Sequence, residues 1–176
     1  MITIDVAVKS QKWLKEKDIE NFVEKTCQKI IPLTEIKKIL TKKFTLEVAV
    51  SLVCDRQIKK INFDFRKKNK ATDVLSFSNL DEKLIRKKGI KKAAGDSNYL
   101  LLGDIVLSYE TIKKESLAQK KNFKDHLTHL ILHSILHLTG YDHEDKKLSR
   151  MGAEEMQNLE IEILRKLKIK NPYQPN

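Results

Sequence analysis

The sequence predicts an α+β domain with one small sheet and a buried helix near the C-terminal end. Met1–Val8 and Thr45–Val53 alternate apolar residues with others, a period typical of strands with one buried face. Segments between and after them repeat apolar residues with helical spacing, and Leu127–Leu138 is apolar on almost every side. Strands interleaved with helices favour an α+β architecture, and 176 residues suit one domain over residues 1–176.

The first half of the chain should add two helices to its two strands. Asp18–Ile31 is expected to be amphipathic, with Asp18 as its N-cap. Asp55 is expected to cap a second helix that ends at Arg66. The apolar stripe of this second helix would comprise Ile58, Ile61 and Phe65, with Asn62 and Phe63 to its sides. Trp13 is expected to pack in the core.

The second half should complete the sheet and bring three more helices. A polar turn at Lys67–Lys70 precedes a short third strand, and a fourth strand is expected near Ile105–Leu107. The third strand is predicted from Val74, Leu75 and Phe77. The expected helices are one from Ser108 to about Ala118, one beginning at Asn122 or Asp125 and one over about 144–168.

Residues 80–98 form a basic segment between the third and fourth strands. Its cations are Lys83, Arg86, Lys87, Lys88, Lys91 and Lys92. We expect a variable loop, in which Lys87 and Lys88 are candidate RNA-binding residues. An inert, solvated insertion explains the same composition, and the two alternatives stay open.

Charge and cysteine content narrow the partners and the compartment. A net charge of +11 favours a polyanion such as RNA, although lysine supplies most of the 35 basic residues and often only solvates a surface. No apolar run is long enough to cross a bilayer, and no signal peptide pattern is visible. Cys27 and Cys54 form no CxxC pair, which indicates free thiols and a cytoplasmic location, although a disulfide stays open.

The stretch from His133 to His143, HSILHLTGYDH, predicts a metal site. His133 and His137 are four residues apart, so both imidazoles lie on one face of a helix. Gly140 can end that helix in a left-handed conformation, which lets His143 return as a third ligand. Three nitrogen ligands suit zinc and leave a fourth position for a water that ionises near neutral pH.

Other polar residues near this stretch have alternative interpretations. Ser134 stands where zinc proteases of the HExxH type carry their glutamate base, which disfavours protein cleavage. Asp104 is either a second carboxylate or a turn cap, and Asp142 either orients a ligand or holds a turn. His126 and His129 are expected to be ordinary buried histidines, because His143 already completes the site.

Three ordered motifs resemble the YbeY family of bacterial metal-dependent endoribonucleases. HSILHLTGYDH is similar to the family signature HGxLHLxGYDH, with Ser134 in place of the usual glycine. FRKKNKATDVLSF, Phe65–Phe77, is similar to the family segment that contains an arginine and ends in TDVLSF, although Asn69 stands where aspartate is common. LGDIVLS, Leu102–Ser108, resembles the GDI segment of the family.

The resemblance implies an α+β fold with a four-stranded mixed sheet, one Zn²⁺ per chain and no organic cofactor. His133, His137 and His143 would be the metal ligands, and Arg66 and His133 the catalytic residues. The implied reaction is hydrolysis of single-stranded RNA in maturation of the 16S ribosomal RNA 3′ end and in ribosome quality control. Ribosomal RNA and the ribosome or its small-subunit proteins would be partners, with no membrane association.

Two other functions remain possible at this point. One is a zinc hydrolase of proteins or small molecules, which Ser134 and the basic charge disfavour. The other is a non-catalytic ribosome assembly factor whose metal is structural, which a fourth protein ligand such as His129 would favour.

Overall fold

The computed structural model describes residues 1–40, 45–81, 90, 98–141 and 152–174. Four strands form one mixed sheet in the order β1-β2-β4-β3. The strands are β1 Ile2–Val8, β2 Thr45–Val53, β3 Val74–Ser78 and β4 Tyr99–Ser108. Strand β2 runs parallel to β1 and β4, and β3 pairs antiparallel with β4 at the edge of the sheet. The sequence prediction of an α+β fold with a small mixed sheet is therefore confirmed.

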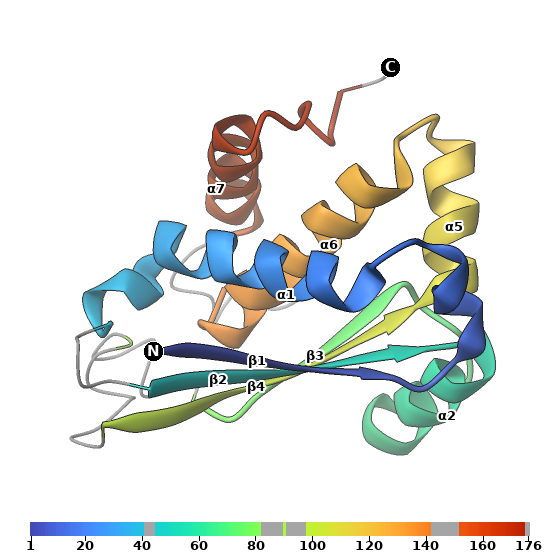
Figure 1. The fold of residues 1–176 in the computed structure, drawn as a ribbon, viewed down its shortest axis with the longest axis horizontal. Helices are drawn as coiled ribbons and strands as arrows, with labels where there is room; N and C mark the ends of the chain where they lie inside the picture. Colours follow the sequence, from blue (N-terminus) through green and yellow to red (C-terminus); the bar gives the residue numbers. More distant parts are fainter. Residues whose placement is uncertain (41–44, 82–89, 91–97, 142–151, 175–176) are drawn as a thin grey trace.

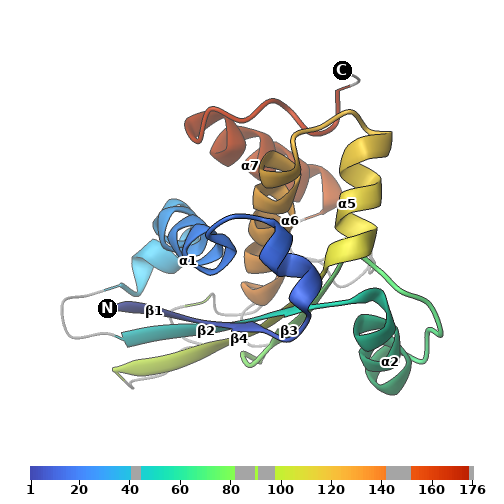
Figure 2. The same cartoon turned by 45° about the vertical axis from the view of Figure 1, so that its right-hand side comes forward.

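Helices cover both faces of the sheet (Figures 1 and 2). The α-helices are α1 Ile19–Ile30, α2 Asp55–Arg66, α5 Tyr109–Ala118, α6 Phe123–Leu138 and α7 Ala153–Lys166. Helices α1 and α6 lie on one face, α2 lies on the other, and α7 lies beyond α6 (Figure 1). Short 3-10 helices occupy Gln11–Lys15, Ile31–Leu33 and Glu35–Lys38. Within the described residues, no helix combines the length and apolar character that a bilayer crossing requires.

The alternation of side chains along the strands decides which residues pack against the helices on each face of the sheet. Alternate residues of β2 point into the main core with α1 and α6, for example Val48 and Val50. A smaller cluster on the other face holds Ile58 of α2 against Leu75 and Val106. The main core also buries Trp13, whose indole Nε1 donates to the Val53 carbonyl oxygen at 2.8 Å.

Strand β4 is longer than the expected Ile105–Leu107, because Gly103 and Asp104 do not interrupt it. Gly103 has φ +152°, and the pairing with β2 shifts between Glu47 and Val48 to accommodate this irregularity. An added Cβ on Gly103 would lie 2.2 Å from the Phe77 carbonyl oxygen, so only glycine lets β3 approach this closely.

The expected start and stripe of α2 are wrong in three details. Cys54, not Asp55, is the N-cap, and Asp55 is the first helical residue. Phe65 is exposed, whereas Asn62 is buried and donates from its side chain to the Lys70 carbonyl oxygen. Asn62 is buried because its side chain donates to the polar turn after α2. Helical periodicity alone cannot predict such a hydrogen bond.

The last helix begins later than expected. Helix α7 starts at Ala153, and its N-cap Gly152 has extended backbone, so one continuous helix over 144–168 is excluded. Residues 142–151 lie outside the described part of the chain. The six cations of the basic 80–98 segment also lie outside it, so its prediction as a loop is not tested. The N-cap position of Asp18 is confirmed, but its side chain makes no capping hydrogen bond there.

Candidate metal centre and active site

Helix α6 carries the histidines, and both of its ends are set locally. The Asn122 side chain accepts from the backbone N–H groups of Lys124 and Asp125, at 2.9 and 3.3 Å, and so caps the helix. At the other end Gly140 has φ +92°, and its N–H donates to the His137 carbonyl oxygen at 3.0 Å. Asn122 is therefore the cap among the two predicted, and Gly140 ends the helix as expected.

The histidine pair is brought together by one turn of α6. The Nε2 atoms of His133 and His137 lie 3.1 Å apart, and their rings are nearly perpendicular at 80°. Two nitrogens bound to one tetrahedral zinc at about 2.0–2.1 Å would lie roughly 3.3 Å apart. The pair therefore fits a shared metal ion. His143 lies outside the described residues, and within them no group of three possible metal ligands is found.

Glu160 of α7 contacts His133 at Nδ1, the ring nitrogen that does not face His137. Its carboxylate is fully buried, and Oε1 lies 2.8 Å from Nδ1 of His133. The Tyr173 hydroxyl donates to Oε2, which also lies 3.5 Å from Nε2 of His129. Burial alone would raise the pKa of the Glu160 carboxyl, but its contacts with His129, His133 and Tyr173 outweigh burial and lower that pKa to about 2.

The Glu160 carboxylate determines which ring nitrogen of His133 is available to bind a metal. An ionised Glu160 only accepts hydrogen bonds, so Nδ1 of His133 carries the proton that it receives. In the neutral form of the ring, the lone pair then lies on Nε2, which faces His137. Burial and the bond to Glu160 raise the pKa of Tyr173, which keeps its hydroxyl a donor. Glu160 and Tyr173 therefore hold the His133 ring so that its Nε2 is available as a metal ligand.

Sequence reasoning missed Glu160, although a signal for it was present. The apolar side of the last helix includes Met156 and Ile163, and Glu160 interrupts that stripe one turn after Met156. Glutamate is almost never fully buried without a partner. An acidic residue inside a buried stripe therefore points to a nearby cation or donor, and the histidines of α6 are the donors.

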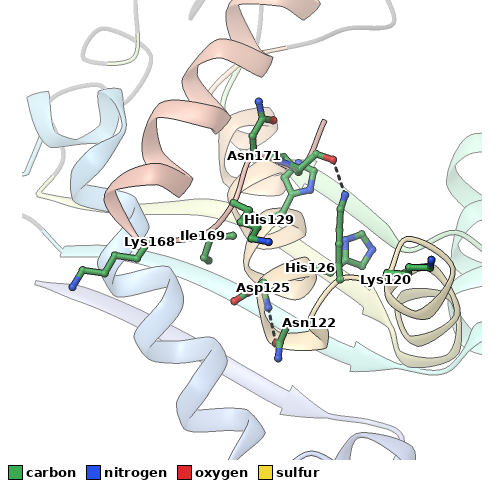
Figure 3. Close-up of a pocket in the computed structure, with 11 residues that line it drawn as sticks. Lys120, Asn122, Asp125, His126, His129, Lys168, Ile169 and Asn171 are labelled. Atoms are coloured by element: carbon green, nitrogen blue, oxygen red, sulfur yellow. Dashed lines mark hydrogen bonds between the residues drawn. The ribbon is translucent and has the colours of Figure 1, made fainter. Parts of the chain in front are cut away.

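His126 and His129 lie on the half of α6 that precedes the pair. They line a cavity of about 330 Å³ together with Lys168, Ile169 and Asn171 of the C-terminal segment (Figure 3). Nε2 of His126 lies 3.0 Å from a Glu115 carboxylate oxygen, and Nε2 of His129 faces Glu160. The His129 and His133 ring centroids are 6.4 Å apart. Within the described residues, His126 is hydrogen bonded to Glu115, whereas His129 approaches Glu160 at 3.5 Å without a hydrogen bond.

The remaining predicted site residues lie elsewhere or outside the described chain. Arg66 is exposed at the last position of α2, a helix that lies on the face of the sheet opposite α6 (Figure 1). Asp104 is exposed within β4 and caps no turn. Ser134 is buried, and its hydroxyl donates to the Leu130 carbonyl oxygen at 2.8 Å. Lys87 and Lys88 lie outside the described residues, as does Asp142.

Comparisons with known proteins agree with the sequence resemblance. The family described as Endoribonuclease YbeY matches residues 5–168. A Bartonella quintana protein named Endoribonuclease YbeY is 39% identical over 173 residues, which are 98% of each chain. An Agrobacterium fabrum protein of the same name is 35% identical over 173 residues, covering 98% of this chain and 95% of its own.

A solved structure supports the fold. A solution structure of a Thermotoga maritima protein has a TM-score of 0.54 and 24% identity, and the match covers 99% of each chain. At this identity the likeness concerns the fold alone. The family match over most of the sequence and the relatives at 35% and 39% identity show that this chain belongs to the YbeY family.

Proposed function

We propose that this protein is a zinc-dependent endoribonuclease that hydrolyses single-stranded RNA. Family membership supports the reaction, because the relatives are named endoribonucleases. One observation carries the metal: the Nε2 atoms of His133 and His137 face each other at 3.1 Å, with Glu160 behind His133. His143 is the proposed third ligand.

Each proposed site residue has a role that its chemistry permits. When bound, zinc would supply a Lewis acid and a water that ionises near neutral pH. His133, His137 and His143 would hold it and leave one position open. Glu160 holds the His133 ring through Nδ1. Arg66, at the end of α2, would bind a phosphate of the same RNA strand through its planar guanidinium and so position that strand for hydrolysis.

We propose ribosomal RNA as the substrate, with a role at the 16S 3′ end and in ribosome quality control. The ribosome and small-subunit proteins are the proposed partners. The net charge of +11 supports a polyanion as substrate. Cys27 and Cys54 are unpaired, which supports a reducing compartment, and we propose the cytoplasm.

The second candidate function, an assembly factor with a structural metal, needs a closed fourth coordination position. His129 would be the ligand that closes it. Its Nε2 instead faces the Glu160 carboxylate at 3.5 Å. This contact favours an open position, and therefore a catalytic metal.

The experiment combines RNA cleavage with metal content. Purified protein is incubated with end-labelled single-stranded RNA, with zinc or with a chelator, and metal is counted by elemental analysis. We expect about one zinc per chain and cleavage that the chelator abolishes. His137→Ala should lose both, whereas His129→Ala, one turn before His133, should keep its metal. Chelator-resistant cleavage would refute the metal role, and metal-loaded protein that binds but never cleaves RNA would favour the assembly factor.

A further inference from the structure

The C-terminal end of α2 presents aromatic rings to solvent beside a run of cations. Phe63 is 49% exposed and Phe65 is 72% exposed. We call this region the α2 basic–aromatic surface, which comprises Phe63, Phe65, Arg66, Lys67, Lys68 and Lys70, all exposed. Within residues 62–70 only Asp64 is acidic. Phe63 and Phe65 are two residues apart in the helix and so point to different sides of it. An exposed ring such as that of Phe65, bordered by cations, is a candidate contact surface.

Hydrogen bonds within the turn hold the backbone of this surface. Asn62 is 1% exposed, and its side chain donates to the Lys70 carbonyl oxygen at 2.8 Å. The N–H of Lys67 donates to the Phe63 carbonyl oxygen at 3.0 Å, and that of Lys68 to the Asn62 carbonyl oxygen at 3.3 Å. Binding therefore does not require ordering of the turn, which lowers its entropic cost.

The Phe65 ring is supported from the sheet side. Its centroid lies 5.1 Å from that of Phe77 in β3, with the planes tilted by 56°. Phe77 therefore limits the motion of the Phe65 ring while most of that ring stays exposed. An aromatic ring that is fixed on one side and open on the other can stack against a planar ligand.

Strand β3 connects this surface to the histidine helix. Phe77 and Ser78 are consecutive, so their side chains point to opposite faces of the sheet. The Ser78 hydroxyl donates to the Leu138 carbonyl oxygen at 2.9 Å, at the end of α6. Phe65 contacts Phe77 and the end of α6 contacts Ser78, so Phe65 and the C-terminal end of α6 lie on either side of the same edge strand.

We propose that the α2 basic–aromatic surface binds single-stranded RNA, with one base stacked on Phe65 and phosphates on the neighbouring cations. Bases of every kind have a face that stacks on an aromatic ring, so this contact tolerates any sequence. The cations follow the backbone of the same strand. The choice of RNA rests on the proposed function, which concerns the histidine site, whereas this surface positions the strand beside it.

The aromatic contact is tested by binding in full-length, zinc-loaded protein. The probe is a fluorescent, phosphorothioate single-stranded RNA that resists cleavage, and anisotropy reports its Kd. Phe65→Leu should weaken binding about five- to a hundredfold, because leucine keeps an apolar side chain but cannot stack. Phe65→Trp should bind like the wild type. The matched control is Leu117→Ala on α5, where the leucine is 70% exposed, and its Kd should stay within twofold.

The cationic contact is tested by salt dependence. A triple variant, Lys67→Gln, Lys68→Gln and Lys70→Gln, should flatten the slope of log K against log salt by about 2, at roughly 0.7 per phosphate on a single strand. The control removes equal charge from exposed lysines around α1, through Lys15→Gln, Lys17→Gln and Lys25→Gln. That control should leave the slope nearly unchanged.

The outcomes separate this surface from the catalytic proposal. Wild-type protein that binds and cleaves RNA, with Phe65→Leu binding equally well, overturns the surface and leaves the function standing. Wild-type protein that binds through Phe65 without cleaving supports the surface and refutes the nuclease. If wild-type protein does not bind the RNA probe, the surface proposal is refuted. Binding loss in Phe65→Leu but not in Phe65→Trp supports stacking, and equal loss in both refutes it.

Discussion

The Glu160→Gln substitution tests whether a carboxylate positions the metal ligand His133. The change keeps the shape of the side chain and removes its charge. In the structure the carboxylate is fully buried and receives hydrogen bonds from His133, at 2.8 Å, and from Tyr173. Glutamine retains one acceptor oxygen for His133, while its amide group has to turn the Tyr173 hydroxyl into an acceptor.

The magnitude follows from those two bonds. Hydrogen bonds to a charged group contribute about 1.5–3 kcal/mol each, against about 1 kcal/mol for neutral ones. Losing the charge at both bonds should therefore lower the free energy of unfolding by about 2 kcal/mol. Glu160→Leu removes both bonds and strands the buried donors, so its cost should reach about 3–5 kcal/mol. Weaker orientation of His133 should reduce zinc affinity about 10- to 100-fold.

The assay separates the two effects. Urea unfolding with a chelator present gives the stability of the metal-free protein, and calorimetric titration gives zinc affinity. Glu162→Gln is the matched control, since Glu162 is on the same helix, is half exposed and pairs with Lys166. It should change stability by less than about 0.5 kcal/mol. Wild-type zinc affinity in Glu160→Gln would refute the positioning role.

Three further predictions concern other regions. Arg66→Ala should lower kcat/KM for RNA about 100-fold or more without shifting Tm, because this helix-end side chain is exposed. Arg66→Lys should recover only part of the rate, since lysine lacks the planar guanidinium. Wild-type rates in either variant would refute the role of Arg66. Gly103→Ala should cost more than about 3 kcal/mol in urea unfolding, since its Cβ would lie 2.2 Å from the Phe77 carbonyl oxygen. Burial raises the pKa of the Cys27 thiol to about 12, so a thiol reagent at pH 8 should label only Cys54 before unfolding; fast labelling of two thiols would contradict this.

Local patterns predicted most elements well. Strand β2 has the expected bounds, and α6 begins after one of its two predicted caps, because alternation and capping depend only on neighbouring residues. The pairing of β4 lies beyond such reasoning. Gly103 and Asp104 look like an interruption in sequence, but hydrogen bonds to β2 and β3 carry the strand through them.

Exposure was the least predictable property of individual residues. Phe65 lies on the predicted apolar stripe of α2, yet it is 72% exposed, because the apolar cluster that α2 covers, around Leu75 and Val106, is small. Asn62 is buried instead, since the turn that ends at Lys70 needs its side-chain donor. Helical period identifies a face, whereas the extent of the neighbouring layer decides which residues of that face are covered.

By itself, the sequence determined the order of the elements and the histidine pair. His133 and His137 share a face of α6 because four residues make about one helical turn. Only the tertiary structure decided that Glu160, 27 residues from His133, supplies the buried carboxylate behind that ring. The physical reason is that helical spacing is a property of the local backbone, whereas the meeting of α6 and α7 depends on how the whole core packs.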